Sequence, residues 1–391
     1  MPGSRHAASA LVTTTVGVLP SSLFAGLAPL IRADLGFEAR WVGVSVGVYF
    51  ATSSVASLHA GRLAERLGSQ RAMWTGVTIS AASLLAIGMV ADSLASLWLL
   101  LAFAGLGNAT IQPAANLALA RGVDESRRGL AFGFKQAAVP MASALGGFAV
   151  PVLGVTLGWR AAFVGAAVLA LLALRLPLPD PPSGGPGRQG ARGLGSVGRT
   201  LVLLAAGIGL GSAAANGMTA YLAEASIDAG WTAAQAGTIL GMGGVCGIVA
   251  RIAVGWYSDR MLSGRLRLVA WMMAVGGIGY GWLMFLDRPV VLALAVPLAF
   301  AAGWGYNGLF IYAVVRLHPH APAAATGVTQ VGAFGGAVFG PPVFGLVADL
   351  GSYPAAWLLM ALFSVTAALL IFLAHRRVVL ERALPPGAAH G

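Results

Sequence analysis

The chain contains a series of long apolar runs with almost no charge, and these runs limit its fold more than any other feature of the sequence. Each run is close to the about 20 apolar residues that an α-helix needs to cross a bilayer. The runs are continuously apolar and do not alternate with polar residues, so helices are favoured over a membrane β-barrel. We count twelve runs, which begin near Ala10, Arg40, Ala72, Ala95, Gly129, Gly158, Arg199, Gln235, Arg267, Pro289, Ala324 and Tyr353.

The composition agrees with a protein that is solvated by lipid. Of the 391 residues, 58% are hydrophobic and only 9% are charged, whereas an average soluble domain has about 25% charged residues. A net charge of +11 could point to nucleic acid, but the basic residues lie in short loops between the apolar runs. This pattern excludes an ordinary soluble enzyme, a disordered protein and a nucleic-acid partner, and it indicates a lipid bilayer.

A polar stretch divides the runs into two groups of six. The stretch is rich in Pro, Gly and Ser, a composition typical of a flexible linker. We therefore predict an all-α membrane protein with twelve transmembrane helices in two six-helix bundles. The predicted parts are an N-terminal bundle at residues 1–177, a linker at 178–198, a C-terminal bundle at 199–377 and a tail at 378–391.

The arginines predict the orientation of the chain in the membrane. With twelve spans both termini lie on one side, and the loops of that side carry eighteen arginines against four on the other side, namely Arg32, Arg40, Arg160 and Arg288. Positive residues concentrate on the cytoplasmic side of membrane proteins. We therefore expect a multi-pass protein of the plasma or inner membrane, with cytoplasmic termini, linker and tail.

Two loops share a sequence pattern at a constant spacing. The loop after the second run reads GRLAERLGSQR, the loop after the eighth reads GWYSDRMLSGRLR, and their matched glycines, acids and bases lie 194 positions apart. Such a repeat predicts two halves of similar fold. An acid followed by a base can hold a neighbouring helix end and release it, although a tight charged turn without a gating role is the alternative. The candidate gating residues are Gly61, Glu65, Arg66, Gly68, Gly255, Asp259 and Arg260.

These features resemble the major facilitator superfamily. The twelve runs, the central linker and both copies of the signature G-x-L-x-D-R-x-G cover essentially the whole chain. The resemblance implies two pseudo-symmetric bundles that rock about a central site, so that access alternates between the two sides. The first copy departs from the signature at Glu65 and Gln70, and the second has a two-residue insertion before Gly264, so the strength of the gate contacts stays open.

Two basic residues fall inside apolar runs instead of loops. Lys135, the only lysine, lies in the fifth run and Arg251 lies in the eighth, each about 9 Å from the cytoplasmic end. One interpretation is that both side chains reach back to the lipid headgroups. In the resembled family helices 5 and 8 meet between the halves, so the resemblance implies two cations that face each other and need an anion between them. Arg251 is also similar to the substrate arginine of monocarboxylate and oxalate–formate transporters, and the chain is similar to the cyanate-type branch.

Neutral polar residues within the runs complete the candidate substrate site. Polar groups inside a membrane are functional candidates by default, and the alternative for each is a hydrogen bond that holds two helices together. We expect no Asp or Glu at mid-membrane depth, since Glu224 and the other acids lie near helix ends or in loops. The candidates besides Lys135 and Arg251 are Asn108, Gln112, Gln136, Asn216, Tyr306, Asn307 and Gln330.

The leading functional interpretation is a monomeric secondary active or facilitative transporter that moves a small solute, an organic anion by preference. Symport, uniport and exchange all remain open. A drug or metabolite efflux antiporter of the same superfamily is the alternative, and Leu101 counts against it because antiporters commonly carry an arginine there. A receptor that binds without transport is a more distant alternative. The sequence has no Walker motif, metal-ligand cluster or nucleophile elbow, so we expect no enzyme activity, no cofactor and no metal.

Overall fold

The computed structural model describes residues 2–124, 128–175, 198–261, 263–318 and 321–383, and all regular structure in these ranges is helical. The helices before the predicted linker are α1 (Pro2–Leu35), α2 (Arg40–Leu67), α3 (Ser69–Val90), α4 (Leu94–Gly122), α5 (Arg128–Gln136), α6 (Ala138–Ala149), α7 (Val155–Leu157) and α8 (Trp159–Ala173). Those after it are α9 (Arg199–Asp228), α10 (Ala233–Arg260), α11 (Arg265–Trp282), α12 (Pro289–Ala301), α13 (Asn307–Leu317), α14 (Pro322–Leu350) and α15 (Tyr353–Ala383).

The described helices account for a membrane-spanning bundle. Nine helical stretches in the described residues are long and apolar enough to cross a bilayer, and one of them runs from α5 through α7. Helix α2 adds a tenth if its two segments, bent by 52°, form one span. The other two predicted spans coincide with shorter apolar helices, namely α8 and the pair α12 and α13. The all-helical membrane fold is thus confirmed, whereas the number twelve stays a prediction.

The repeat in the sequence reappears in the helix boundaries. Helix α5 begins at residue 128 and α14 at 322, and α8 begins at 159 and α15 at 353, so both pairs are 194 positions apart. We call α1–α8 the N half and α9–α15 the C half. Most of the predicted linker (residues 178–197) and the last part of the predicted tail (residues 384–391) lie outside the described residues, and the division into two domains stays a prediction.

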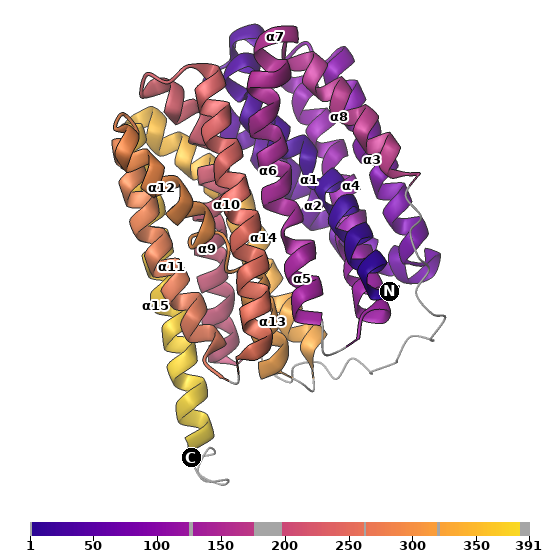
Figure 1. Ribbon diagram of the computed structural model, residues 1–391, viewed down its shortest axis with the longest axis vertical. Coiled ribbons are helices and arrows are strands. Elements are labelled where there is room, and N and C mark those ends of the chain that lie inside the picture. Colours follow the sequence, from indigo (N-terminus) through magenta and orange to yellow (C-terminus); the bar gives the residue numbers. More distant parts are fainter. Residues whose placement is uncertain (1, 125–127, 176–197, 262, 319–320, 384–391) are drawn as a thin grey trace.

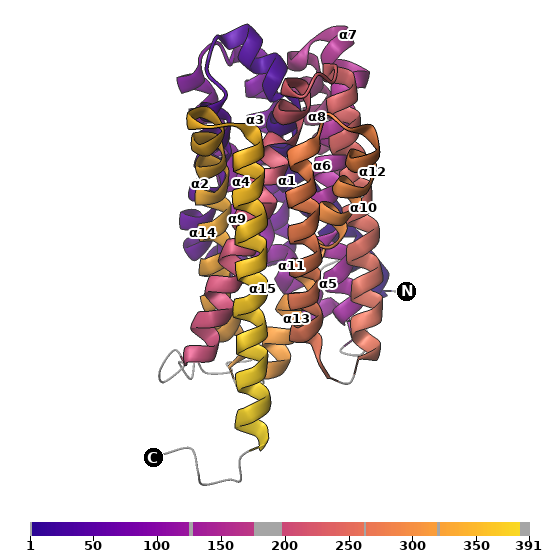
Figure 2. The ribbon, with the colours of Figure 1, turned by 90° about the vertical axis from the view of Figure 1, so that its left-hand side faces the viewer.

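The helices stand side by side and run between two ends of the molecule (Figures 1 and 2). We call the end where α15 ends, at the bottom of Figure 1 and in the same half of the bundle as the start of α1, the terminal face. The opposite end, where α1 passes into α2, is the distal face. Helix α15 extends farther than its neighbours at the terminal face, as both views show.

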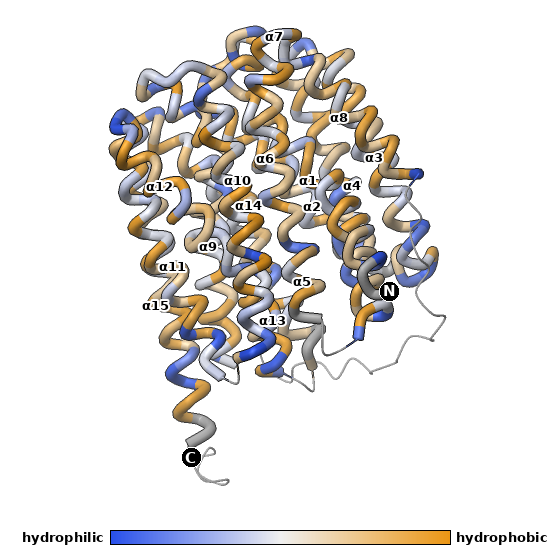
Figure 3. The backbone as a smooth tube through the Cα atoms, viewed as in Figure 1, coloured by the Kyte–Doolittle hydropathy of each residue, from blue (hydrophilic) through white to orange (hydrophobic). Residues whose placement is uncertain are grey.

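The sides of the bundle are suited to lipid and not to water. Large apolar side chains stay exposed along the helices, among them Leu99 at 72%, Trp271 at 64% and Phe339 at 67%. Figure 3 shows apolar residues along most of the helix length and hydrophilic residues gathered mainly toward the two ends. An exposed apolar surface of this extent marks contact with a membrane. Lipid tails are themselves apolar, so these side chains do not need to be buried inside the protein.

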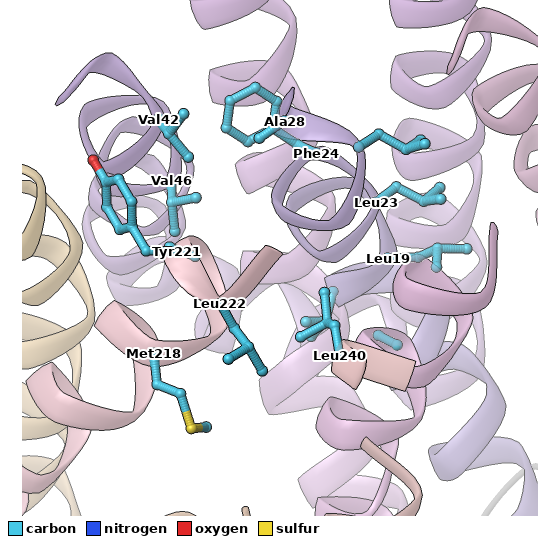
Figure 4. Close-up of a cluster of buried hydrophobic side chains, with 14 of the residues drawn as sticks. Leu19, Leu23, Phe24, Ala28, Val42, Val46, Met218, Tyr221, Leu222 and Leu240 are labelled. Atoms are coloured by element: carbon cyan, nitrogen blue, oxygen red, sulfur yellow. The ribbon is translucent and has the colours of Figure 1, made fainter. Parts of the chain in front are cut away.

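Both halves contribute to one central core. Buried side chains of α1 and α2 meet those of α9 and α10, and Phe24, Val46, Leu222 and Leu240 belong to the same cluster (Figure 4). The arrangement brings helices that are distant in sequence into contact, since α10 packs on α5 and α6, and α14 packs on α2. The interface between the halves therefore supplies the walls of any central cavity.

Close contact between the halves depends on a missing side chain at Gly147. A Cβ on this residue of α6 would lie 2.6 Å from the carbonyl oxygen of Gly237 in α10. We expect Gly147→Ala to force α6 and α10 apart, because overpacking a tight contact costs about 1–3 kcal/mol. Thermal unfolding of the purified protein measures the loss. Gly165→Ala is the matched control, since its nearest neighbour would be Leu153 at 3.7 Å; equal unfolding midpoints for the two variants would contradict the packing argument.

Candidate functional site

A cavity of about 620 Å³ lies between the two halves. Helices α1, α2, α4, α5 and α6 line it from the N half, and α9, α10, α13, α14 and the turn at Trp304 line it from the C half. It extends from Val18 and Asn108, in the middle of their helices, to Glu65 and Thr326 near the terminal face. Of the nine candidate substrate residues, the cavity lining brings together Asn108, Gln112, Lys135, Gln136, Asn216, Arg251, Asn307 and Gln330.

Lys135 reaches the cavity from the end of a short helix. Helix α5 ends at Gln136 and α6 begins at Ala138, because the ring nitrogen of Pro140 has no hydrogen to donate to the carbonyl four residues earlier. Lys135 is thus in the last turn of α5, where a positive charge interacts favourably with the helix dipole. Its side chain is 3% exposed, so the ammonium group is enclosed by the surrounding protein.

A chain of hydrogen bonds connects Lys135 to α2. The Lys135 ammonium donates to Gln112 Oε1, Gln112 Nε2 donates to Asn108 Oδ1 at 3.2 Å, and Asn108 Nδ2 donates to Ser53 Oγ at 2.7 Å. Each donor in the chain fixes the orientation of the next amide. The ammonium group has three hydrogens, so this chain holds Lys135 in place while leaving donors for a ligand.

Arg251 enters the same cavity from α10 but is held differently. One terminal nitrogen donates to the Gln136 carbonyl, the other donates to the Trp304 carbonyl at 3.0 Å, and the guanidinium lies 4.8 Å from the centre of the Trp304 ring. Arg251 is 3% exposed. The arginine therefore contacts the N half through Gln136 and the C half through Trp304.

The neutral candidates outside the hydrogen-bond chain of Asn108 and Gln112 are placed in three different ways. Asn216 donates to the carbonyl of Ser212 at 2.8 Å and is used within its own helix. Tyr306 is fully buried and does not line the cavity. The candidates Gln136, Asn307 and Gln330, and also Asn116, line the cavity with side-chain amides that make no hydrogen bond to other described residues.

The cavity has positive charges without a nearby acid. Among the described residues neither Lys135 nor Arg251 makes an ion pair, and the carboxylate in the lining is Glu65, near the terminal face. Two like charges in a medium of low dielectric constant repel each other. The deep part of the described cavity lining therefore carries an excess of positive charge.

The two loop signatures make different contacts at the terminal face. Asp259 Oδ2 accepts a hydrogen bond of 3.1 Å from the backbone nitrogen of Leu130, at the start of α5, and so joins the C half to the N half. Arg260 donates to the Trp256 carbonyl of its own helix. Glu65 makes no ion pair with described residues and lines the cavity. Gly68 has a φ of +85° and ends α2 in a turn that favours glycine.

The distal face is closed by contacts that the sequence did not reveal. Arg32 Nε and Nη2 donate to the two carboxylate oxygens of Glu224 at 3.0 and 3.3 Å, which joins α1 to α9. Tyr221 of α9 accepts a hydrogen bond of 2.8 Å from the backbone nitrogen of Gly43 in α2. Glu224 lies near a helix end as expected, but it is only 3% exposed. The available signal was that Arg32 is one of only four arginines predicted on this side.

The donor types in the described part of the chain do not suggest a metal centre, since no group of three or more His, Cys, Asp or Glu side chains gathers there. The cavity, its polar lining and the repeated halves instead suit a carrier of small solutes. The model of the Major Facilitator Superfamily matches residues 10–337. The chain belongs to the Major Facilitator Superfamily. As a member it is a multi-pass membrane transporter of small molecules and not an enzyme.

Several relatives in the superfamily are similar over different lengths. An uncharacterized MFS-type transporter of Mycobacterium tuberculosis (strain ATCC 25618 / H37Rv) is 27% identical over 97% of this chain and 86% of its own length. Monocarboxylate transporter 12 of Homo sapiens is 29% identical over 39% of this chain and 30% of its own length. A crystal structure of a bacterial homologue of the human lysosomal transporter Spinster, in an inward-facing and occupied conformation, has the same fold, with a TM-score of 0.74, 16% identity and 97% and 98% of the two chains covered.

Proposed function

We propose that this superfamily member is a monomeric secondary transporter that moves a small organic anion by alternating access. The observation that carries the proposal is the pair of buried cations, Lys135 and Arg251, that line one cavity without a carboxylate partner among the described residues. Removing charged groups from water is unfavourable unless they are paired. A carboxylate of the substrate supplies the missing negative charge, and the free amides of Asn116, Gln136, Asn307 and Gln330 receive the rest of a polar molecule.

The contacts at the two faces support an alternating-access cycle. The cavity extends toward the terminal face, while the pair Arg32–Glu224 and the hydrogen bond from Gly43 to Tyr221 join the halves at the distal face. Opening the distal face requires these contacts to break. We propose that the terminal face is cytoplasmic in an inner or plasma membrane, because the predicted loops on that side carry the excess of arginine.

Export of cationic drugs fits the cavity less well. A cation needs acidic partners in a membrane site, and the acid in the described lining is Glu65, near the terminal face, with Lys135 and Arg251 deeper inside. The similarity to part of monocarboxylate transporter 12 agrees with an anionic substrate and supplies the first probes.

A stability screen tests the proposal directly. We expect small carboxylates such as acetate, lactate and malonate to raise the unfolding midpoint of the purified protein, because a ligand that binds only the folded state stabilises it by mass action. At about 100 times the dissociation constant the gain is about 2.7 kcal/mol. Choline and tetraethylammonium, at equal ionic strength, are the controls. Stabilisation by these cations and not by carboxylates would overturn the proposed substrate class.

A further inference from the structure

We infer that Arg251 is a latch between the two halves and that Lys135 is the cation that binds the substrate anion. The inference rests on the proposed function and assigns different roles to the two buried cations. It is carried by the partners of the guanidinium: both terminal nitrogens donate to backbone carbonyls, one in each half. Among the described residues, the Lys135 ammonium donates to a single side-chain oxygen, that of Gln112.

The first carbonyl is free because of a proline. In an uninterrupted helix the carbonyl of Gln136 would accept from the backbone nitrogen of residue 140, but Pro140 has no hydrogen there. A buried carbonyl without a donor is unfavourable, and Arg251 supplies the donor. Gly247, one turn before Arg251 in α10, makes room for Pro140, since a Cβ at Gly247 would lie 2.9 Å from the proline ring.

The second carbonyl lies in the break between α12 and α13. Residues 302–306 form turns between these helices, and Trp304 belongs to them. Its carbonyl accepts from Arg251 at 3.0 Å, and its ring lies against the guanidinium. One planar guanidinium thus satisfies backbone groups at two interrupted helices, which the single ammonium group of a lysine cannot span.

The latch has a consequence for the substrate and for transport. The two carbonyls fix the position of the Arg251 guanidinium, which keeps Nε–H and one hydrogen on each terminal nitrogen as further donors. The Lys135 ammonium is held by one side-chain oxygen among the described residues and can shift toward an anion more easily. Lys135 and Arg251 line the same cavity, so the charge of an anion bound at Lys135 changes the electrostatic field at the guanidinium. This field links binding to the breaks in α5–α6 and α12–α13 that the guanidinium holds together. The cavity accordingly suits one carboxylate on a polar body, with Arg251 as a positioning residue that links binding to movement.

A double-mutant cycle in the full-length, ligand-free protein tests the latch. We expect Arg251→Lys, which keeps the charge, to lower the unfolding midpoint by about 3 °C or more. Pro140→Ala returns a backbone donor to Gln136, so the double variant should lose measurably less than the sum of the two single effects. Additive effects, or an Arg251→Lys protein that unfolds like the parent, would overturn the latch whether or not the protein binds anions.

Binding and turnover separate the latch from a second ligand. With acetate as the probe, Arg251→Lys should change the dissociation constant less than about 3-fold while it lowers uptake into vesicles at least about 10-fold. An affinity loss as large as that of Lys135→Gln would make Arg251 a ligand instead.

Arg265→Lys is the matched control, because Arg265 is also buried and donates to two carbonyls, those of Ser258 and Met261, but within the C half. The Arg265→Lys protein should be less stable than the parent but should keep the uptake of the parent. A parent protein that binds no carboxylate would overturn the proposed function, and with it the role of Lys135 as ligand, but not the stability cycle.

Discussion

Lys135→Gln should weaken the binding of small carboxylates at least about 30-fold and reduce their uptake into vesicles in proportion. Removing one partner of a buried, hydrogen-bonded charge pair costs about 2–5 kcal/mol, and each 1.4 kcal/mol is a factor of about ten in affinity. Glutamine keeps a donor at this position but removes the charge. Titration calorimetry of the purified variant measures the affinity, and uptake of labelled acetate measures transport.

The same substitution should not destabilise the ligand-free protein. Lys135 is 3% exposed and has no acidic partner among the described residues, so its charge disfavours the folded state until an anion arrives. We expect the unfolding midpoint of Lys135→Gln without ligand to equal or exceed that of the parent. Arg288→Gln is the control, since it removes one positive charge from an exposed site outside the cavity. Unchanged carboxylate affinity in Lys135→Gln would remove this residue from the site.

The sequence predicted the helices well because membrane spans are determined locally. A run of about 20 apolar residues becomes a helix whatever its neighbours are, since the backbone must pair its own polar groups in lipid. Helices accordingly begin at Arg40, Arg199, Pro289 and Tyr353 as predicted. The breaks at Ala137 and at residues 302–306 are harder to predict, because Pro140 interrupts α5–α6 but other prolines, such as Pro113, lie inside continuous helices.

The sequence predicted most of the residues that line the cavity, but it did not predict which atoms those residues contact. Ionisable and amide side chains inside apolar runs are rare enough to be recognised, and most of those named from the sequence line one cavity. Their partners depend on which helices meet and at which height. Tyr306 therefore was not distinguishable from the cavity residues, although its ring is in the core of the C half. The carbonyl partners of Arg251 are backbone atoms and leave no mark in the pattern of residue types.

The contacts of Glu224 at the distal face could not be predicted from the sequence either. Substitution of Glu224 should have the second large effect. The carboxylate is buried between the halves and accepts two hydrogen bonds from Arg32. Removing one partner of a fully buried ion pair costs about 3–5 kcal/mol, and exposed pairs contribute about 0–1 kcal/mol. Glu224 is 3% exposed and Arg32 is 31% exposed, so this pair lies between the two cases, at about 1.5–3 kcal/mol. That cost falls on the conformation in which the distal face is closed, so Glu224→Gln should shift the population toward distal opening by about 10-fold or more.

Distances between the distal ends of the halves measure this shift. In a background with Cys246→Ser, which removes the single native thiol, spin labels at Ala33→Cys in α1 and Leu350→Cys in α14 should move apart in Glu224→Gln.

The matched control is Asp349→Asn. It breaks the pair of Asp349 with Arg40, which also joins the halves, at 3.2 Å, and whose side chains are 33% and 44% exposed. Exposed pairs contribute about 0–1 kcal/mol, so its distance distribution should stay near that of the parent. Replacing both partners, in Arg32→Met with Glu224→Leu, removes the charge that Glu224→Gln leaves unpaired and should restore much of the closed population. If Glu224→Gln and Asp349→Asn give the same distances, the pair of Arg32 and Glu224 does not hold the distal face closed.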